Sequence, residues 1–69
     1  MNEKKAIEHL RALLRTAKKY GYPMERMLVC DGFLTALNMM SGKKYGFSGT
    51  DIFIRDDYGY IKEYIEEVA

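Results

Sequence analysis

The stretch Met27–Met40, MLVCDGFLTALNMM, constrains the fold most, because all but three of its fourteen residues are apolar or glycine. Its central Asp31-Gly32 pair is a common turn of β-hairpins. The residues on either side of that pair do not alternate between polar and apolar, as half-buried strands do. The polar residues Asp31, Thr35 and Asn38 instead share one side of a helix. We therefore predict a helix over residues 24–41, beginning near Pro23.

Gly32 leaves two versions of this helix open. A glycine in mid-helix costs about 1 kcal/mol relative to alanine, which favours a kink at this point. Alternatively, the helix breaks and Asp31 caps a shorter second piece. In both versions the segment contributes a broad apolar face to the core, formed by Val29, Cys30, Phe33, Leu34, Leu37 and Met40.

Residues 3–20 carry the clearest helical pattern of the chain. Apolar side chains recur there at helical spacing, namely Ile7, Leu10, Leu14 and Ala17, with Leu13 and Tyr20 beside them. Asn2 is suited to cap the first turn, and Gly21 is suited to end the last one. We predict an amphipathic helix that packs against the helix over 24–41.

After Gly42 the pattern changes to glycines mixed with β-branched and aromatic residues. Ile52-Phe53-Ile54 indicates a strand, and Tyr45 and Phe47 indicate its partner across the turn at Ser48-Gly49-Thr50. We therefore predict a short β-hairpin over residues 44–55.

The C-terminal stretch is compatible with a helix or with a strand. A helix over 58–68 gathers Ile61, Tyr64, Ile65 and Val68 on one face, with Asp57 as its cap. A strand mixes apolar and charged side chains on one face, although the sequence DDYG can turn a hairpin. We expect the helix.

Together these elements predict one small α+β domain over residues 1–69: two packed helices, a hairpin and a C-terminal helix. The single cysteine excludes an internal disulfide bond, and one cysteine with one histidine cannot make a four-ligand zinc site. We expect no metal and no cofactor. Small domains without these supports often associate, so a homodimer through the strand edge or the methionine-rich helix is a further expectation.

The expected location is the cytoplasm. The N-terminal residues lack the apolar core of a secretory signal, and no apolar run approaches the ~20 residues of a membrane span. A single free cysteine also suits a reducing compartment.

We do not expect an enzyme. A nucleophile needs a base beside it, and the one histidine, His9, lies at the edge of an apolar helix face. Cys30 lies on an apolar face, where a thiol is typically inert. The acidic residues Asp51, Asp56 and Asp57 lack the spacing of a calcium loop and are explained by turn formation.

Charge is distributed unevenly and suggests nucleic-acid binding as the alternative function. Residues 1–20 carry a net charge of +4, residues 21–50 carry +1 and residues 51–69 carry −4, which sum to the overall +1. On the first helix, one stripe of cations could contact phosphates: Lys4, Arg11, Arg15 and Lys18. The near-neutral total charge counts against this alternative.

Protein recognition is the function that we predict. Six tyrosines and three phenylalanines are more than a core of this size can bury, and tyrosine is enriched at interfaces. We predict a non-catalytic inhibitor, adaptor or regulator that binds a larger protein, one with a basic groove. Its acidic, tyrosine-rich contact surface would consist of Tyr45, Asp56, Asp57, Tyr58, Tyr60 and Glu63.

Overall fold

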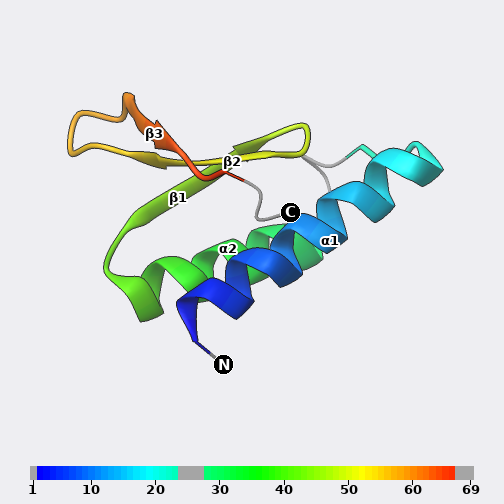
Figure 1. The fold of residues 1–69 in the computed structure, drawn as a ribbon, viewed down its shortest axis with the longest axis horizontal. Coiled ribbons are helices and arrows are strands. Elements are labelled where there is room, and N and C mark those ends of the chain that lie inside the picture. Colours follow the sequence, from blue (N-terminus) through cyan, green and yellow to red (C-terminus); the bar gives the residue numbers. More distant parts are fainter. Residues whose placement is uncertain (1, 24–27, 67–69) are drawn as a thin grey trace.

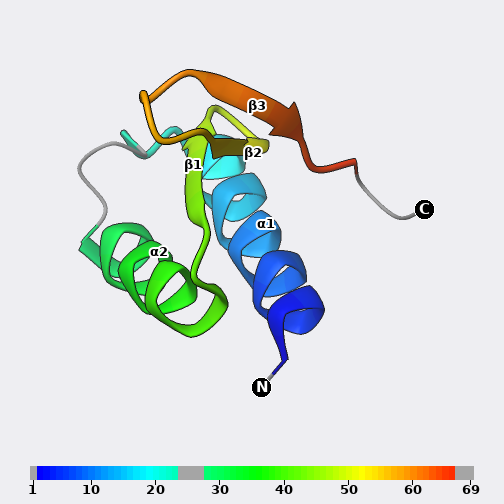
Figure 2. The same cartoon turned by 90° about the vertical axis from the view of Figure 1, so that its left-hand side faces the viewer.

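The computed structural model describes residues 2–23 and 28–66, and it consists of two helices and a three-stranded antiparallel sheet. In chain order these elements are α1 (Glu3–Tyr20), α2 (Leu28–Ser41), β1 (Lys44–Ser48), β2 (Asp51–Arg55) and β3 (Ile61–Tyr64). Both helices lie on one face of the sheet, whose strand order is β1-β2-β3 (Figures 1 and 2). The predicted α+β class is confirmed.

Local sequence signals define both ends of α1. The Asn2 side chain accepts a hydrogen bond from the Lys5 N–H at 2.8 Å, which caps the first turn. Gly21 adopts a left-handed conformation with φ of 72°. There the N–H groups of Gly21 and Tyr22 donate to the carbonyls of Lys18 and Ala17, the pattern of a Schellman motif. The predicted helix over 3–20 is confirmed.

Helix α2 runs through Gly32 without interruption, so Asp31 does not cap a separate piece. Residues 24–27 of the predicted helix lie outside the described residues. Cys30 and Leu37 are buried, whereas Val29 and Met40 are 62% and 50% exposed. The prediction that these last two residues belong to the core is wrong, because the fold covers only one side of α2.

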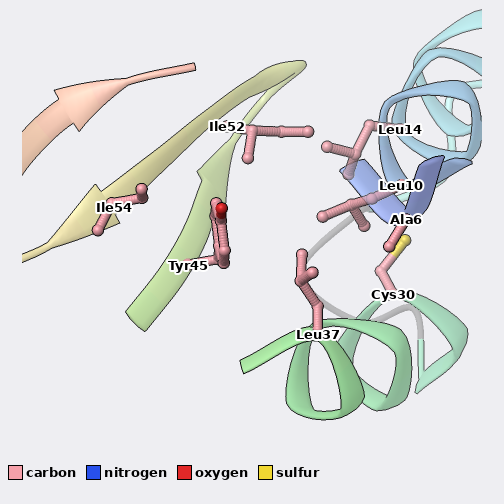
Figure 3. Close-up of a cluster of buried hydrophobic side chains, with 8 residues drawn as sticks. All are labelled: Ala6, Leu10, Leu14, Cys30, Leu37, Tyr45, Ile52 and Ile54. Carbon is pink, nitrogen blue, oxygen red and sulfur yellow. The ribbon is translucent and has the colours of Figure 1, made fainter. Parts of the chain in front are cut away.

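The core lies between the helices and the inner face of the sheet (Figure 3). It combines side chains from both helices and from two strands: Ala6, Leu10, Leu14, Cys30, Leu37, Tyr45, Ile52 and Ile54. Phe33 and Leu34, which were predicted to be core residues, are partly buried against it. Tyr20, at the end of α1, is exposed.

Strands β1 and β2 form the predicted hairpin. Ser48 pairs with Asp51, so the connection is the two residues Gly49 and Thr50. Gly49 has a φ of 61°, a conformation that glycine adopts without strain. The hairpin and its turn glycine were readable from sequence, although the predicted turn included Ser48, which instead ends β1.

The predicted C-terminal helix is wrong. Residues 61–64 form β3, which pairs antiparallel with β2 and contains an irregularity opposite Ile54 and Arg55. The Ile65 N–H donates to the Ile52 carbonyl at 2.8 Å and continues the ladder past Tyr64. This pairing with β2 satisfies the backbone, and the alternative of a hairpin turn at DDYG is correct. Residues 67–69 of the predicted helix lie outside the described residues.

Candidate interaction surface

The turn between β2 and β3 is held by its own hydrogen bonds. The Asp56 carboxylate accepts from the N–H groups of Tyr58 at 2.9 Å and Tyr60 at 3.0 Å. The Asp56 N–H donates to the Tyr60 carbonyl at 2.8 Å, and the Arg55 guanidinium donates to the Gly59 carbonyl at 2.7 Å. This turn, which we call the hairpin tip (residues 56–60), extends past the helices (Figure 1).

The hairpin tip presents tyrosine rings to solvent. Tyr58 is 88% exposed and Tyr60 is 74% exposed. Tyr64 and Ile61 on the adjoining strand are also exposed. These last two residues were not predicted at the surface, because the expected helix over 58–68 placed both on its apolar face. Pairing β3 with β2 instead leaves them at the sheet edge.

Tyr45, which was predicted as a contact residue, is buried in the core. Its hydroxyl donates a hydrogen bond to the Glu3 carboxylate, which also pairs with Lys43 at 2.8 Å. Burial and the neighbouring Glu3 raise the pKa of Tyr45. The hydrogen bonds from Lys43 and Tyr45 lower the pKa of Glu3. Tyr45 therefore links the sheet to the start of α1, and it is not available for contact with another protein.

The charge around the hairpin tip is mixed. The Asp57 side chain is 95% exposed and lies 3.3 Å from the Lys44 ammonium group. Glu63 is exposed on β3, opposite Ile54. A shallow hollow of about 260 Å³ at the base of the tip is lined by both signs of charge, including Lys62, Arg55 and Asp57. Asp56 differs from Asp57 because its carboxylate is used inside the turn.

The outer face of the sheet has one buried aromatic side chain, Phe53. Phe53 is only 2% exposed, although it lies on the face opposite the helices. It packs over Gly46 and meets the Tyr64 ring edge-on, at 5.9 Å between ring centroids. The Arg55 guanidinium lies 4.8 Å from the Phe53 ring centroid, within cation–π range. These contacts fix the base of the β2–β3 hairpin.

The predicted basic stripe does not form a purely cationic surface. The Arg11 guanidinium donates to the Ile65 carbonyl at 2.7 Å and joins α1 to the segment after β3. A groove of about 740 Å³ lies at this junction. It is bordered by three cations and three carboxylates: Lys4, Arg11, Arg15, Glu3, Glu8 and Glu66. Lys18, the fourth residue of the stripe, is exposed near the other end of α1.

The two candidates for nucleophilic chemistry lie in ordinary structural environments. Cys30 is fully buried, and desolvation raises the pKa of its thiol above the usual value. His9 is exposed and stacks on Phe33, with ring centroids 5.2 Å apart. Within residues 2–23 and 28–66, no group of three acidic, histidine or cysteine side chains is arranged to hold a metal ion. In the same residues, no helix has the length and apolar character needed to cross a membrane.

Comparison of the chain with protein-family models, with curated proteins and with solved structures finds no match. Any functional conclusion therefore depends on the arrangement of the residues themselves.

Proposed function

We propose that this chain is a non-catalytic interaction protein, an inhibitor, adaptor or regulator, that binds a larger protein through the hairpin tip and the adjoining β3. The observation that carries this proposal is the exposure of Tyr58 and Tyr60 on a turn that is internally hydrogen-bonded. The hydrogen bonds fix the backbone of the turn, so the two exposed rings project from an ordered scaffold onto which another surface can pack.

The geometry of the tip favours tight binding for an entropic reason. Ordering a loop when a complex forms costs free energy that must come from the new contacts. Here the Asp56 carboxylate and the Arg55 guanidinium already hold the backbone of the turn. Tyrosine adds contact area at low conformational cost and is common among residues that dominate binding.

The expected partner surface is a groove with an aromatic pocket and basic flanks. Asp57 is almost fully exposed at the tip, and Glu63 is exposed on β3. A cationic flank would complement both carboxylates and increase the rate of association. Of the six residues predicted as contacts, Tyr45 is excluded by burial and Asp56 acts by shaping the turn.

The test is capture of partners by the tagged chain from a native lysate, divided into nuclease-treated and untreated halves. We expect a discrete protein that survives nuclease and is lost with the double variant Tyr58→Ala and Tyr60→Ala. The matched control is Tyr20→Ala with Tyr22→Ala, which removes two exposed tyrosines away from the hairpin. With the purified partner, the tip variant should weaken binding by roughly 30-fold or more. Equal binding by both double variants would contradict the assigned surface.

Nucleic-acid binding remains a second candidate because of one observation. Three of the four cations in the predicted stripe, Lys4, Arg11 and Arg15, border the same groove. The three glutamates around them oppose a phosphate backbone, which ranks this function second. Phosphate binding requires an affinity that falls steeply with salt. It also requires loss of binding in Lys4→Glu, which reverses a cation of this groove and leaves the Arg11 bond to Ile65 intact.

A further inference from the structure

The two edges of the sheet differ in how their backbone groups are used. At the β1 edge, the Asn38 side chain accepts from the Tyr45 N–H at 2.8 Å and donates to the Tyr45 carbonyl at 3.4 Å. This amide acts as a short substitute strand and occupies the outward backbone groups of Tyr45, the second residue of β1. Such protection is a common way in which proteins prevent unwanted strand pairing.

The β3 edge has a different character. Because the Ile65 N–H bonds to Ile52 of β2, the alternation of an antiparallel ladder directs the backbone groups of Tyr64 and Glu66 away from β2. All four side chains of β3 are exposed, including Ile61 and Tyr64. In both overall views β3 forms the outer edge of the sheet (Figures 1 and 2).

We infer that a second copy of this chain pairs with the β3 edge, antiparallel, with Tyr64 of each copy on the twofold axis. Antiparallel pairing about a twofold axis uses the same surface of both copies. In this register Tyr64 faces Tyr64 of the second copy. Lys62, the residue at the irregularity of β3, then lies opposite Glu66 of the second copy, and Glu66 lies opposite its Lys62. The edge is therefore complementary to itself in charge.

Two alternative registers, centred on Glu63 and on Lys62, are less favourable for a simple electrostatic reason. Placing Glu63 on the axis would bring two carboxylates face to face, and placing Lys62 there would bring two ammonium groups together. Like charges directly opposite each other destabilise a strand pair. The register centred on Tyr64 also pairs those residues whose backbone groups point outward, so each axial residue donates and accepts across the interface.

The resulting assembly would be a six-stranded sheet with all helices on one face, since the axis is perpendicular to the sheet. The hairpin tips would lie at opposite ends of the new interface, with Asp57 and Tyr58 of each copy free. The dimer and the proposed function share β3, so in the dimer the larger protein would contact the hairpin tips. If both hold, the dimer presents two binding tips.

The experiment measures the mass of the full chain by analytical ultracentrifugation over a range of concentrations, for wild type and for charge variants. In the dimer, residue 62 of one copy lies opposite residue 66 of the other. Lys62→Glu makes both residues of this pair acidic, and Glu66→Lys makes both basic. Each variant alone should raise the dimer dissociation constant roughly tenfold. Mixing the two variants should restore dimers, now heterodimers with matched charges, and the double swap in one chain should restore homodimers.

A second variant tests the backbone part of the inference. Tyr64→Pro removes an N–H that faces away from β2, a change that edge strands tolerate. It should abolish the dimer while circular dichroism remains that of the wild type, and Tyr64→Phe should leave the dimer intact. A wild-type chain that stays monomeric up to about 1 mM overturns the inference. A dimer dissociation constant that is the same in wild type and in the charge variants overturns the inference as well. This outcome does not depend on whether Tyr64→Pro folds.

Discussion

At the scale of single residues, we expect replacement by alanine to have opposite effects on stability at Gly46 and at Gly32. A Cβ atom at Gly46 would lie 2.6 Å from Cε1 of Phe53, so alanine must displace the ring that covers the outer face of the sheet. We expect Gly46→Ala to lower the free energy of unfolding by about 1–3 kcal/mol. Gly32 has nothing within 4 Å of its Cβ position, and it lies inside α2. Gly32→Ala should therefore stabilise by about 1 kcal/mol.

Urea unfolding followed by circular dichroism, at one protein concentration, measures both changes. A neutral Gly46→Ala would mean that Phe53 moves aside freely, and that the packing of the outer face contributes little to stability.

The carboxylate of Glu3 gives the fold a defined dependence on acid. Lys43 and then Tyr45 lower its pKa below the ordinary value of 4.5. A group whose folded-state pKa is lowered contributes stability above its ordinary pKa and loses it as the pH falls through the folded value. We expect Glu3→Gln to destabilise the protein at pH 7, and this difference should vanish in stronger acid, below the folded-state pKa.

Unfolding curves of wild type and Glu3→Gln, measured from neutral to acidic pH, test this dependence. Glu8→Gln, an exposed glutamate on the same helix, is the control and should show a much smaller effect at neutral pH. A difference for Glu3→Gln that is constant with pH would rule out the linkage to Lys43 and Tyr45.

At the scale of elements, the hairpin tip separates two neighbouring aspartates by role. Asp56→Ala leaves the N–H groups of Tyr58 and Tyr60 without their acceptor, so we expect a loss of roughly 1 kcal/mol in unfolding free energy. Amide hydrogen exchange at these two tyrosines should become faster. Asp57→Ala removes only an exposed ion pair with Lys44 and should stay within about 0.5 kcal/mol of wild type. Equal exchange rates in the two variants would show that Asp56 does not brace the turn.

At the scale of the whole molecule, Cys30 reports on global unfolding. Its thiol is fully buried in the core, and burial raises its pKa, which disfavours the reactive thiolate. We expect a maleimide to label the folded protein at least roughly a thousandfold more slowly than it labels a cysteine peptide. If labelling requires global unfolding, Gly46→Ala should accelerate it by the same factor by which this substitution increases the equilibrium constant of unfolding. Rapid labelling with native circular dichroism would place Cys30 outside the core.

The parts of the fold that were predicted correctly depend on neighbours in the chain. Helix α1 has its apolar spacing, its Asn2 cap and its Gly21 stop within one continuous segment. The β1–β2 hairpin likewise has its turn glycine, Gly49, between the two strands that it joins. Such signals act over a few residues, so the interactions that decide these elements can be recognised from the local sequence.

The tertiary structure decided the rest, because the competing local preferences were close. Residues 61–64 suit a helix by their apolar spacing, yet β2 offers them a ladder of hydrogen bonds, and they form β3. Val29 and Met40 suit a core, but the two layers cover only one side of α2. Tyr45 carries a polar tip suited to an interface, and the register of β1 turns it toward the helices and Glu3. The sequence by itself thus determined the helix and hairpin whose signals are local. The pairing of β3, the burial of individual side chains and the exposure of the hairpin tip depend instead on contacts between elements that are distant in the chain.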